Sequence, residues 1–217
     1  MKKCASAVSV IGGADGPTSV FLLKRNSKLT LKQKLHKFKY NMKKAYVEKT
    51  LKAGTHTMDE VMAYLVKVHG FTELGKEELE EEYNEMRASF LIQHASELLG
   101  EYAELPKLKS ESQEDLLEYM RQAQERVQKA KEIPTTEFDI DFHKFQISFE
   151  DINDNIHILI EKRFNYIGGG ASGNKKILKR FHRIYKDIYR YYGVTEDDMK
   201  NKTKRYEEVV RTLSRKR

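Results

Sequence analysis

Apolar residues recur every three or four positions through most of this 217-residue chain, and no other feature of the sequence constrains the fold as strongly. This spacing places apolar side chains on one face of a helix. Thr30, Thr57 and Thr195 each stand three positions before an amide or acidic residue, which is the pattern of a capping box at the start of a helix. The sequence predicts helices over about 30–53, 57–69, 76–99, 112–131, 175–192 and 195–213.

Between residues 138 and 149 the apolar residues recur at every second position and alternate with polar ones. This alternation shifts by one position once, between residues 142 and 145. A hairpin that turns at His143 and Lys144 would bring all the apolar side chains to one face, and a single kinked strand is the alternative. A short helix over 151–160 and a glycine-rich loop over 167–174 are expected to follow. The apolar residues of this alternation are Phe138, Ile140, Phe142, Phe145, Ile147 and Phe149.

These elements predict a mainly α fold with a small β element (α+β). We expect a helical bundle of six or seven helices, with a short hairpin or small antiparallel sheet from residues 8–23 and 137–149. An apolar share of 39% suffices for one compact domain or two small ones. The expected divisions are a β-rich segment at 1–25, a helical region at 26–134, and a hairpin with basic helices at 135–217.

Residues 4–23 form the one stretch that resembles a membrane segment, and Asp15 is its only charge. Gly12, Gly13 and Pro17 interrupt it, whereas a spanning helix needs about 20 apolar residues without such breaks. We therefore expect a soluble, cytoplasmic protein without stable membrane insertion. The single cysteine excludes a disulfide framework and any multi-cysteine metal site.

The run Ile11-Gly12-Gly13-Ala14-Asp15-Gly16-Pro17-Thr18 resembles a signature of the β subunits of sodium-ion-translocating decarboxylases, the oxaloacetate, methylmalonyl-CoA and glutaconyl-CoA family. The resemblance implies a membrane location and a site for the coupling Na⁺. Asp15 would supply the carboxylate and Thr18 an oxygen, while Gly12, Gly13 and Gly16 shape the backbone. It covers about 15 of the 217 residues. Taken by themselves, the same residues indicate a tight turn between two strands.

A second glycine-rich segment has the spacing G-x-G-x-x-G. Gly168, Gly170 and Gly173 precede Lys175 and Lys176 at the start of a predicted helix. Backbone N–H groups, a helix N-terminus and two lysines suit an anion, so this segment is either an anion-binding nest or a flexible linker.

Charge is unevenly distributed along the chain. Residues 24–50 carry a net charge of +9, residues 73–104 carry −8 and residues 162–217 carry +11. The basic ends either complement the acidic middle within the fold or bind nucleic acid, anionic lipid or an acidic protein. The candidate nucleic-acid residues are Lys179, Arg183, Lys186 and Arg190, which are interleaved with aromatic residues on the helix 175–192.

The helix expected over 30–53 is amphipathic. Its apolar stripe is formed by Leu31, Leu35, Phe38, Met42 and Ala45. This stripe either faces the core, with the lysines in solvent, or binds a membrane surface or a partner. No arrangement of nucleophile, base and acid is visible, and Asp139 and Asp141 fit the solvated face of a strand. We expect no catalytic residues, no metal ligands and no cofactor, with Na⁺ implied by the resemblance alone.

The sequence favours a soluble, non-enzymatic interaction protein that has a protein partner. Two alternatives remain open. In the first alternative, the chain is a fragment or accessory subunit of a sodium-translocating decarboxylase. In the second, it binds nucleic acid through its basic C-terminal helices.

Overall fold

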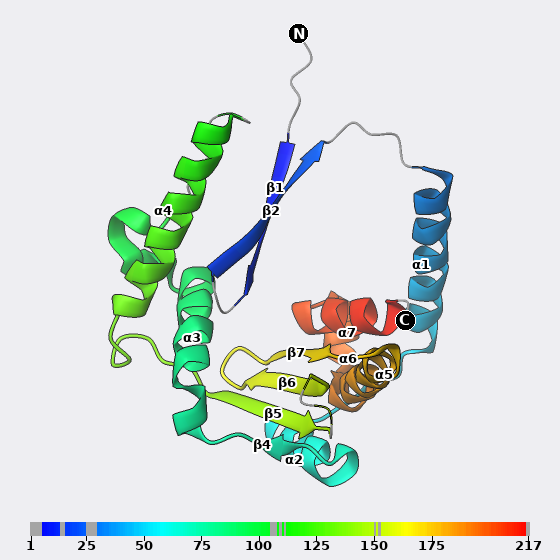
Figure 1. Ribbon diagram of the computed structural model, residues 1–217. Helices are drawn as coiled ribbons and strands as arrows, with labels where there is room; N and C mark the ends of the chain where they lie inside the picture. Colours follow the sequence, from blue (N-terminus) through cyan, green and yellow to red (C-terminus); the bar gives the residue numbers. More distant parts are fainter. Residues whose placement is uncertain are drawn as a thin grey trace. The chain divides into compact units, whose positions relative to one another are not determined.

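The computed structural model describes residues 6–13, 16–24, 30–104, 108, 110, 112–149, 151 and 153–215 (Figure 1). The fold is mainly α with a small β element, as predicted. The chain divides into two compact units, and each is assembled from two separate stretches of sequence. We call Met1–Lys28 with Lys76–Asp141 the acidic unit and Leu29–Gly75 with Phe142–Arg217 the basic unit. The acidic unit has 19 Asp and Glu against 13 Lys and Arg, and the basic unit has 27 Lys and Arg against 14 Asp and Glu.

The acidic unit begins with an antiparallel hairpin of β1 (Ser6–Gly13) and β2 (Gly16–Lys24). The two strands predicted at the N-terminus are confirmed, and they pair with each other. The prediction that they share one sheet with residues 137–149 is wrong, because β5 (Phe142–Ser148) belongs to a separate sheet. Two 3-10 helices, η1 (Lys76–Leu79) and η2 (Ser96–Tyr102), flank helix α3 (Glu80–His94), and α4 (Gln113–Glu132) packs against α3 and η2. The predicted single helix over 76–99 is wrong, because the backbone leaves the helical region at Ala95.

Two buried arginines hold the helical part of the acidic unit together. Arg87 on α3 donates to the carbonyl oxygens of Ile133 (2.6 Å) and Lys131 (2.9 Å), where α4 ends. Arg126 on α4 donates to those of Tyr102 (2.8 Å) and Ala103 (2.6 Å), where η2 ends. The last carbonyls of a helix lack partners within the helix, so each guanidinium satisfies groups that would otherwise be buried without a hydrogen bond.

The basic unit contains an antiparallel sheet in the order β4-β5-β6-β7. The strands are β4 (Thr72–Glu73), β5 (Phe142–Ser148), β6 (Asn155–Glu161) and β7 (Tyr166–Ser172). Register pairs Phe145 with Ile158 and Ile158 with Gly169. Ile156, Ile158 and Ile160 alternate along β6 and are fully buried, which places the core on one face of the sheet.

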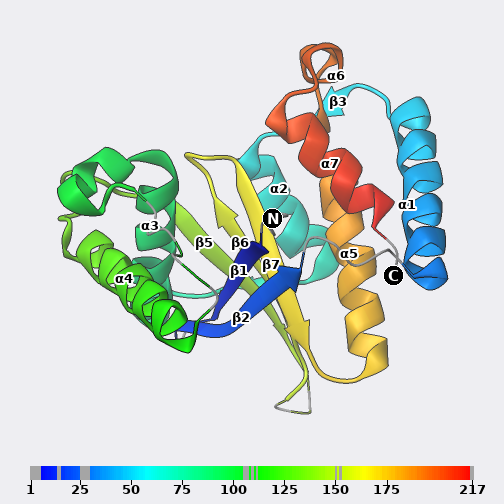
Figure 2. The ribbon, with the colours of Figure 1, turned by 90° about the horizontal axis from the view of Figure 1, so that it is seen from above.

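Helices cover that face. α2 (Met58–His69), α5 (Lys175–Tyr192) and α7 (Lys204–Ser214) contribute to one hydrophobic cluster with the sheet, and α5 lies beside β7 (Figure 2). A two-stranded pairing of β3 (Gly54–Thr55) with β8 (Gly193–Val194) and the short helix α6 (Glu196–Asn201) lie near the end of α5. α1 (Leu31–Thr50) packs on α7. The capping boxes predicted at Thr30, Thr57 and Thr195 are all present.

Three predictions between residues 138 and 174 are wrong. His143 and Lys144 lie inside the single strand β5 rather than in a turn, so Phe142 and Phe145 point to opposite faces of the sheet. The predicted helix over 151–160 is replaced largely by strand β6, and most of the predicted glycine-rich loop is strand β7. The predicted last helix is also two helices, because the backbone at Lys202 is left-handed (φ 48°) between α6 and α7.

Candidate functional site

The N-terminal motif lies on the hairpin of the acidic unit. Gly12 pairs with Pro17 and Gly13 with Gly16, and the register shifts between Ile11 and Gly12. Thr18 belongs to β2. Asp15, the carboxylate on which the expected Na⁺ site depends, lies outside the described residues. The sodium site therefore stays a prediction.

The second glycine-rich segment has a role within the sheet. Gly169 has a φ of 155°, and a Cβ atom at this position would come within 2.5 Å of the backbone oxygen of His157 on β6. A Cβ atom at Gly170 would contact the His157 ring at 3.0 Å. These glycines allow β7 to lie close to β6, and they do not form a loop that precedes a helix.

The start of α5 already has an internal acceptor. The side chain of Asn174 accepts hydrogen bonds from the N–H groups of Lys176 (2.8 Å) and Ile177 (3.4 Å). Asp154 in turn accepts from the N–H of Asn174 (3.3 Å) and from its side-chain amide (3.0 Å). The N–H groups of Asn174, Lys176 and Ile177 are therefore bonded within the fold, while Lys175 and Lys176 are exposed. Anion binding by this segment stays a prediction.

The basic residues of α5 separate from its aromatic residues. Lys179, Arg183 and Arg190 are exposed, whereas Lys186 donates from Nζ to the backbone oxygen of Leu213 (3.2 Å) near the end of α7. Tyr189 is buried and donates to the backbone oxygen of Ile167 (2.9 Å). The expected interleaving of aromatic and basic residues is thus a core stripe behind a basic face. Nucleic-acid binding stays a prediction that rests on charge alone.

Three tyrosines of the aromatic stripe on α5 have raised pKa values because of their burial. Burial raises the pKa of the Tyr189 hydroxyl and, to a smaller extent, those of Tyr185 and Tyr192. Tyr185 also donates to the backbone oxygen of Ile167, at 3.1 Å. The Tyr185 and Tyr189 hydroxyls are neutral hydrogen-bond donors to β7. None of the three hydroxyls supplies a base at physiological pH.

Two polar clusters join elements that are far apart in the sequence. Tyr64 on α2 donates to Asp187 on α5 at 2.7 Å, and this hydrogen bond, followed by burial, raises the pKa of Tyr64 to about 12. His69 Nε2 lies 3.2 Å from the same carboxylate oxygen. More than a hundred residues separate the partners, so no local spacing in the sequence indicates this cluster. Its geometry fixes α2 against α5.

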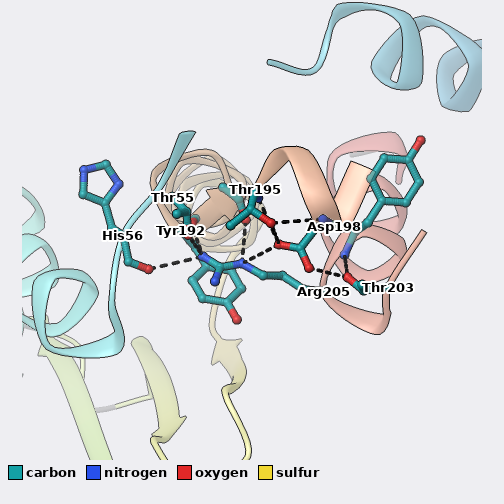
Figure 3. Close-up of polar contacts among 9 residues, drawn as sticks. Thr55, His56, Tyr192, Thr195, Asp198, Thr203 and Arg205 are labelled. Atoms are coloured by element: carbon teal, nitrogen blue, oxygen red, sulfur yellow. Dashed lines mark hydrogen bonds and ion pairs between the residues drawn. The ribbon is translucent and has the colours of Figure 1, made fainter. Parts of the chain in front are cut away.

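The second cluster surrounds Arg205 (Figure 3). Its guanidinium donates to the backbone oxygens of Gly193 (2.9 Å), Tyr192 (2.5 Å) and His56 (3.2 Å), and it lies 3.7 Å from the centre of the Tyr192 ring. Burial alone would raise the pKa of Asp198 nearby, but hydrogen bonds from Thr203 and Thr195 and the charge of Arg205 lower it below its usual value. The cluster joins β3, α5, α6 and α7.

The stripe on α1 is not part of the core. Leu31, Leu35, Phe38 and Met42 are all exposed, and Phe38 exposes 61% of its surface. The one buried residue of α1 is Val47, which joins the main hydrophobic cluster. The interpretation of the stripe as core-facing is therefore wrong, and the apolar face of α1 is the surface of the basic unit that most needs an explanation.

Within the described ranges, no three His, Cys, Asp or Glu side chains gather in a way that could hold a metal ion. In the same part of the chain, no helix has both the length and the apolar character that crossing a bilayer requires. Comparison with protein-family models, with curated proteins and with solved structures gives no match. Any functional conclusion thus depends on the chain's own surfaces.

Proposed function

We propose that this chain is an interaction protein and that its binding element is the apolar stripe of α1, formed by Leu31, Leu35, Phe38 and Met42. The observation that supports the proposal is the exposure of all four side chains on one helix. Contiguous apolar surface of this kind is typical of interaction sites, whereas scattered exposed apolar residues are ordinary.

The spacing of the stripe fits helix-mediated recognition. Its residues follow the pattern i, i+4, i+7 and i+11, with which amphipathic helices bind apolar surfaces. The lysines and His36 between them are also exposed, because every residue from 31 to 39 is exposed. A helical segment without tertiary contacts is marginally stable in water, so a partner that covers the stripe would also stabilise the helix.

Site-specific photo-crosslinking in the cells that express the protein tests this proposal. We expect a benzoyl-phenylalanine at Phe38 to form a defined covalent adduct, because Phe38 lies in the centre of the stripe. The matched control is the same residue at His36, which is exposed on another side of α1. Equal labelling at both positions, or no adduct at Phe38, would contradict the proposal.

A further inference from the structure

α1 is anchored to the basic unit in its second half. Val47 is buried, with 9% of its surface exposed, and Lys43 Nζ donates to the backbone oxygen of Arg215 at 3.2 Å. Figure 1 shows the first turns of α1 extending past the end of α7. The N-terminal half of the helix therefore projects from the unit that anchors it.

The stripe and the anchoring residue face in different directions. At about 100° per residue, Leu31, Leu35, Phe38 and Met42 fall within about 60° of one another around the helix axis. Val47 lies about 150° from the centre of that arc. Packing on α7 therefore leaves the stripe uncovered, and both faces of the helix can be occupied at once.

Lysines border the stripe on both sides. Lys34 lies about 70° to one side of its centre and Lys39 about 70° to the other. The helix has seven lysines and one acidic residue, Glu48. Lys44 lies 3.8 Å from that carboxylate, so the acid is near the anchored end and away from Leu31 and Leu35.

This arrangement matches an anionic bilayer more closely than a protein groove. A helix that lies in the headgroup region inserts a narrow apolar face, and lysines on both flanks extend their charged ends toward the lipid phosphates. The basic unit as a whole adds a long-range electrostatic attraction to an anionic surface, because its formal net charge is +13. Nucleic acid would complement the lysines but would leave the four apolar side chains in water.

We propose that α1 binds the surface of bilayers that contain anionic phospholipid, with Leu31, Leu35, Phe38 and Met42 inserted between the headgroups. The inference rests on the proposed function and names the partner of the same stripe. Insertion parallel to the surface needs no spanning segment, and the rest of the basic unit stays in water.

Co-sedimentation of the full chain with vesicles tests the inference. We expect the wild-type protein to bind vesicles of equal parts phosphatidylglycerol and phosphatidylcholine, and not vesicles of phosphatidylcholine alone. The double variant Leu35→Gln/Phe38→Gln should bind more weakly by about tenfold for each lost apolar side chain. The double variant Lys34→Gln/Lys39→Gln should bind more weakly and with a smaller dependence on salt.

The matched control removes apolar surface of the same kind elsewhere. Leu117 exposes 59% and Leu178 exposes 40% of its surface, compared with 51% for Leu35. The double variant Leu117→Gln/Leu178→Gln should bind vesicles like the wild type. Equal thermal unfolding midpoints would show that all the variants are folded, as expected for substitutions at exposed positions.

Three results would overturn the inference. One is an absence of binding to anionic vesicles. Another is vesicle binding that survives Leu35→Gln/Phe38→Gln, because such binding would depend on charge alone. The exposed basic face of α5 could then account for it, and that face would bind an oligonucleotide equally well. A third is self-association through the stripe, seen as a concentration-dependent dimer that this variant abolishes. A protein adduct at position 38 together with failed vesicle binding would leave the proposed function standing and remove the lipid.

Discussion

At the scale of single residues, Arg205 shows how one side chain completes a helix end. The last carbonyl groups of α5 have no partner within the helix. Gly193, with a φ of 61°, turns the chain so closely past β3 that a Cβ atom there would lie 1.8 Å from the backbone oxygen of Gly54. Arg205 then reaches back from α7 and donates to the carbonyl oxygens of Gly193 and Tyr192. The planar guanidinium satisfies several acceptors at once, which a lysine ammonium does not do in this geometry.

Replacing Arg205 should therefore lower the free energy of unfolding. We expect Arg205→Lys to cost about 1–3 kcal/mol, because carbonyl oxygens of Tyr192, Gly193 and His56 lose donors. Arg211→Lys on the same helix is the control. Arg211 is exposed, so its substitution should change the free energy by less than about 0.5 kcal/mol. Chemical denaturation of both variants measures the difference, and equal values would contradict the role of Arg205.

At the scale of elements, the helices could be predicted because their signals are local. A capping box uses residues three positions apart, and those at Thr30 and Thr57 form as the sequence indicates. The break after Lys202 could not be predicted in the same way. It uses a left-handed residue without a glycine, and the Thr203 cap that follows it resembles many other threonines in the chain.

The four-stranded sheet cannot be predicted from the sequence, because the spacing of the apolar residues in β6 fits both a helix and a strand. Ile156 and Ile160 are four positions apart, which fits one face of a helix and equally one face of a strand. The β-branched Ile158 between them favours the strand. The glycines of β7 are typical of a loop when the sequence is taken alone, because their close approach to β6 is a tertiary contact that local sequence does not contain.

Ile158 separates the two interpretations by experiment. In the predicted helix it lies outside the apolar stripe, whereas in β6 it is fully buried opposite Phe145. We expect Ile158→Ala to lower the free energy of unfolding by about 2–5 kcal/mol through the lost burial and the cavity. Gln146→Ala, on the opposite face of the sheet, should change it by less than about 0.5 kcal/mol. A small effect at Ile158 in thermal or chemical unfolding would be incompatible with the strand.

Periodicity also identified the candidate binding residues of α1 without showing which side of the helix is buried. The apolar stripe is visible in the sequence, but a stripe predicts a buried face only when another element covers it. Here α1 packs on α7, and Val47, which joins the main hydrophobic cluster, lies on the other side of the helix from the stripe. The anchoring contact joins residues more than 150 positions apart, and neither their spacing nor their composition predicts it.

At the scale of the whole molecule, charge separates by unit. The acidic run at 73–104 lies almost entirely in the acidic unit, while residues 29–50 and 162–217, which hold most of the basic residues of the two basic runs, fold together in the basic unit. The sequence shows three charged regions but not that the first and last share a core, because contacts such as that of Lys43 with Arg215 connect distant segments. This assembly leaves the basic unit with the charge and the exposed helix that surface binding requires.

The most direct test of this account is the fluorescence of one tryptophan placed in the stripe. The chain has no tryptophan, so Phe38→Trp reports on that position alone, and His36→Trp is its control on another side of α1. On addition of vesicles of equal parts phosphatidylglycerol and phosphatidylcholine, the account predicts a shift to shorter wavelength and protection from acrylamide for Trp at position 38, with little change at position 36. An unchanged spectrum at position 38, or the same shift at both positions, would contradict it.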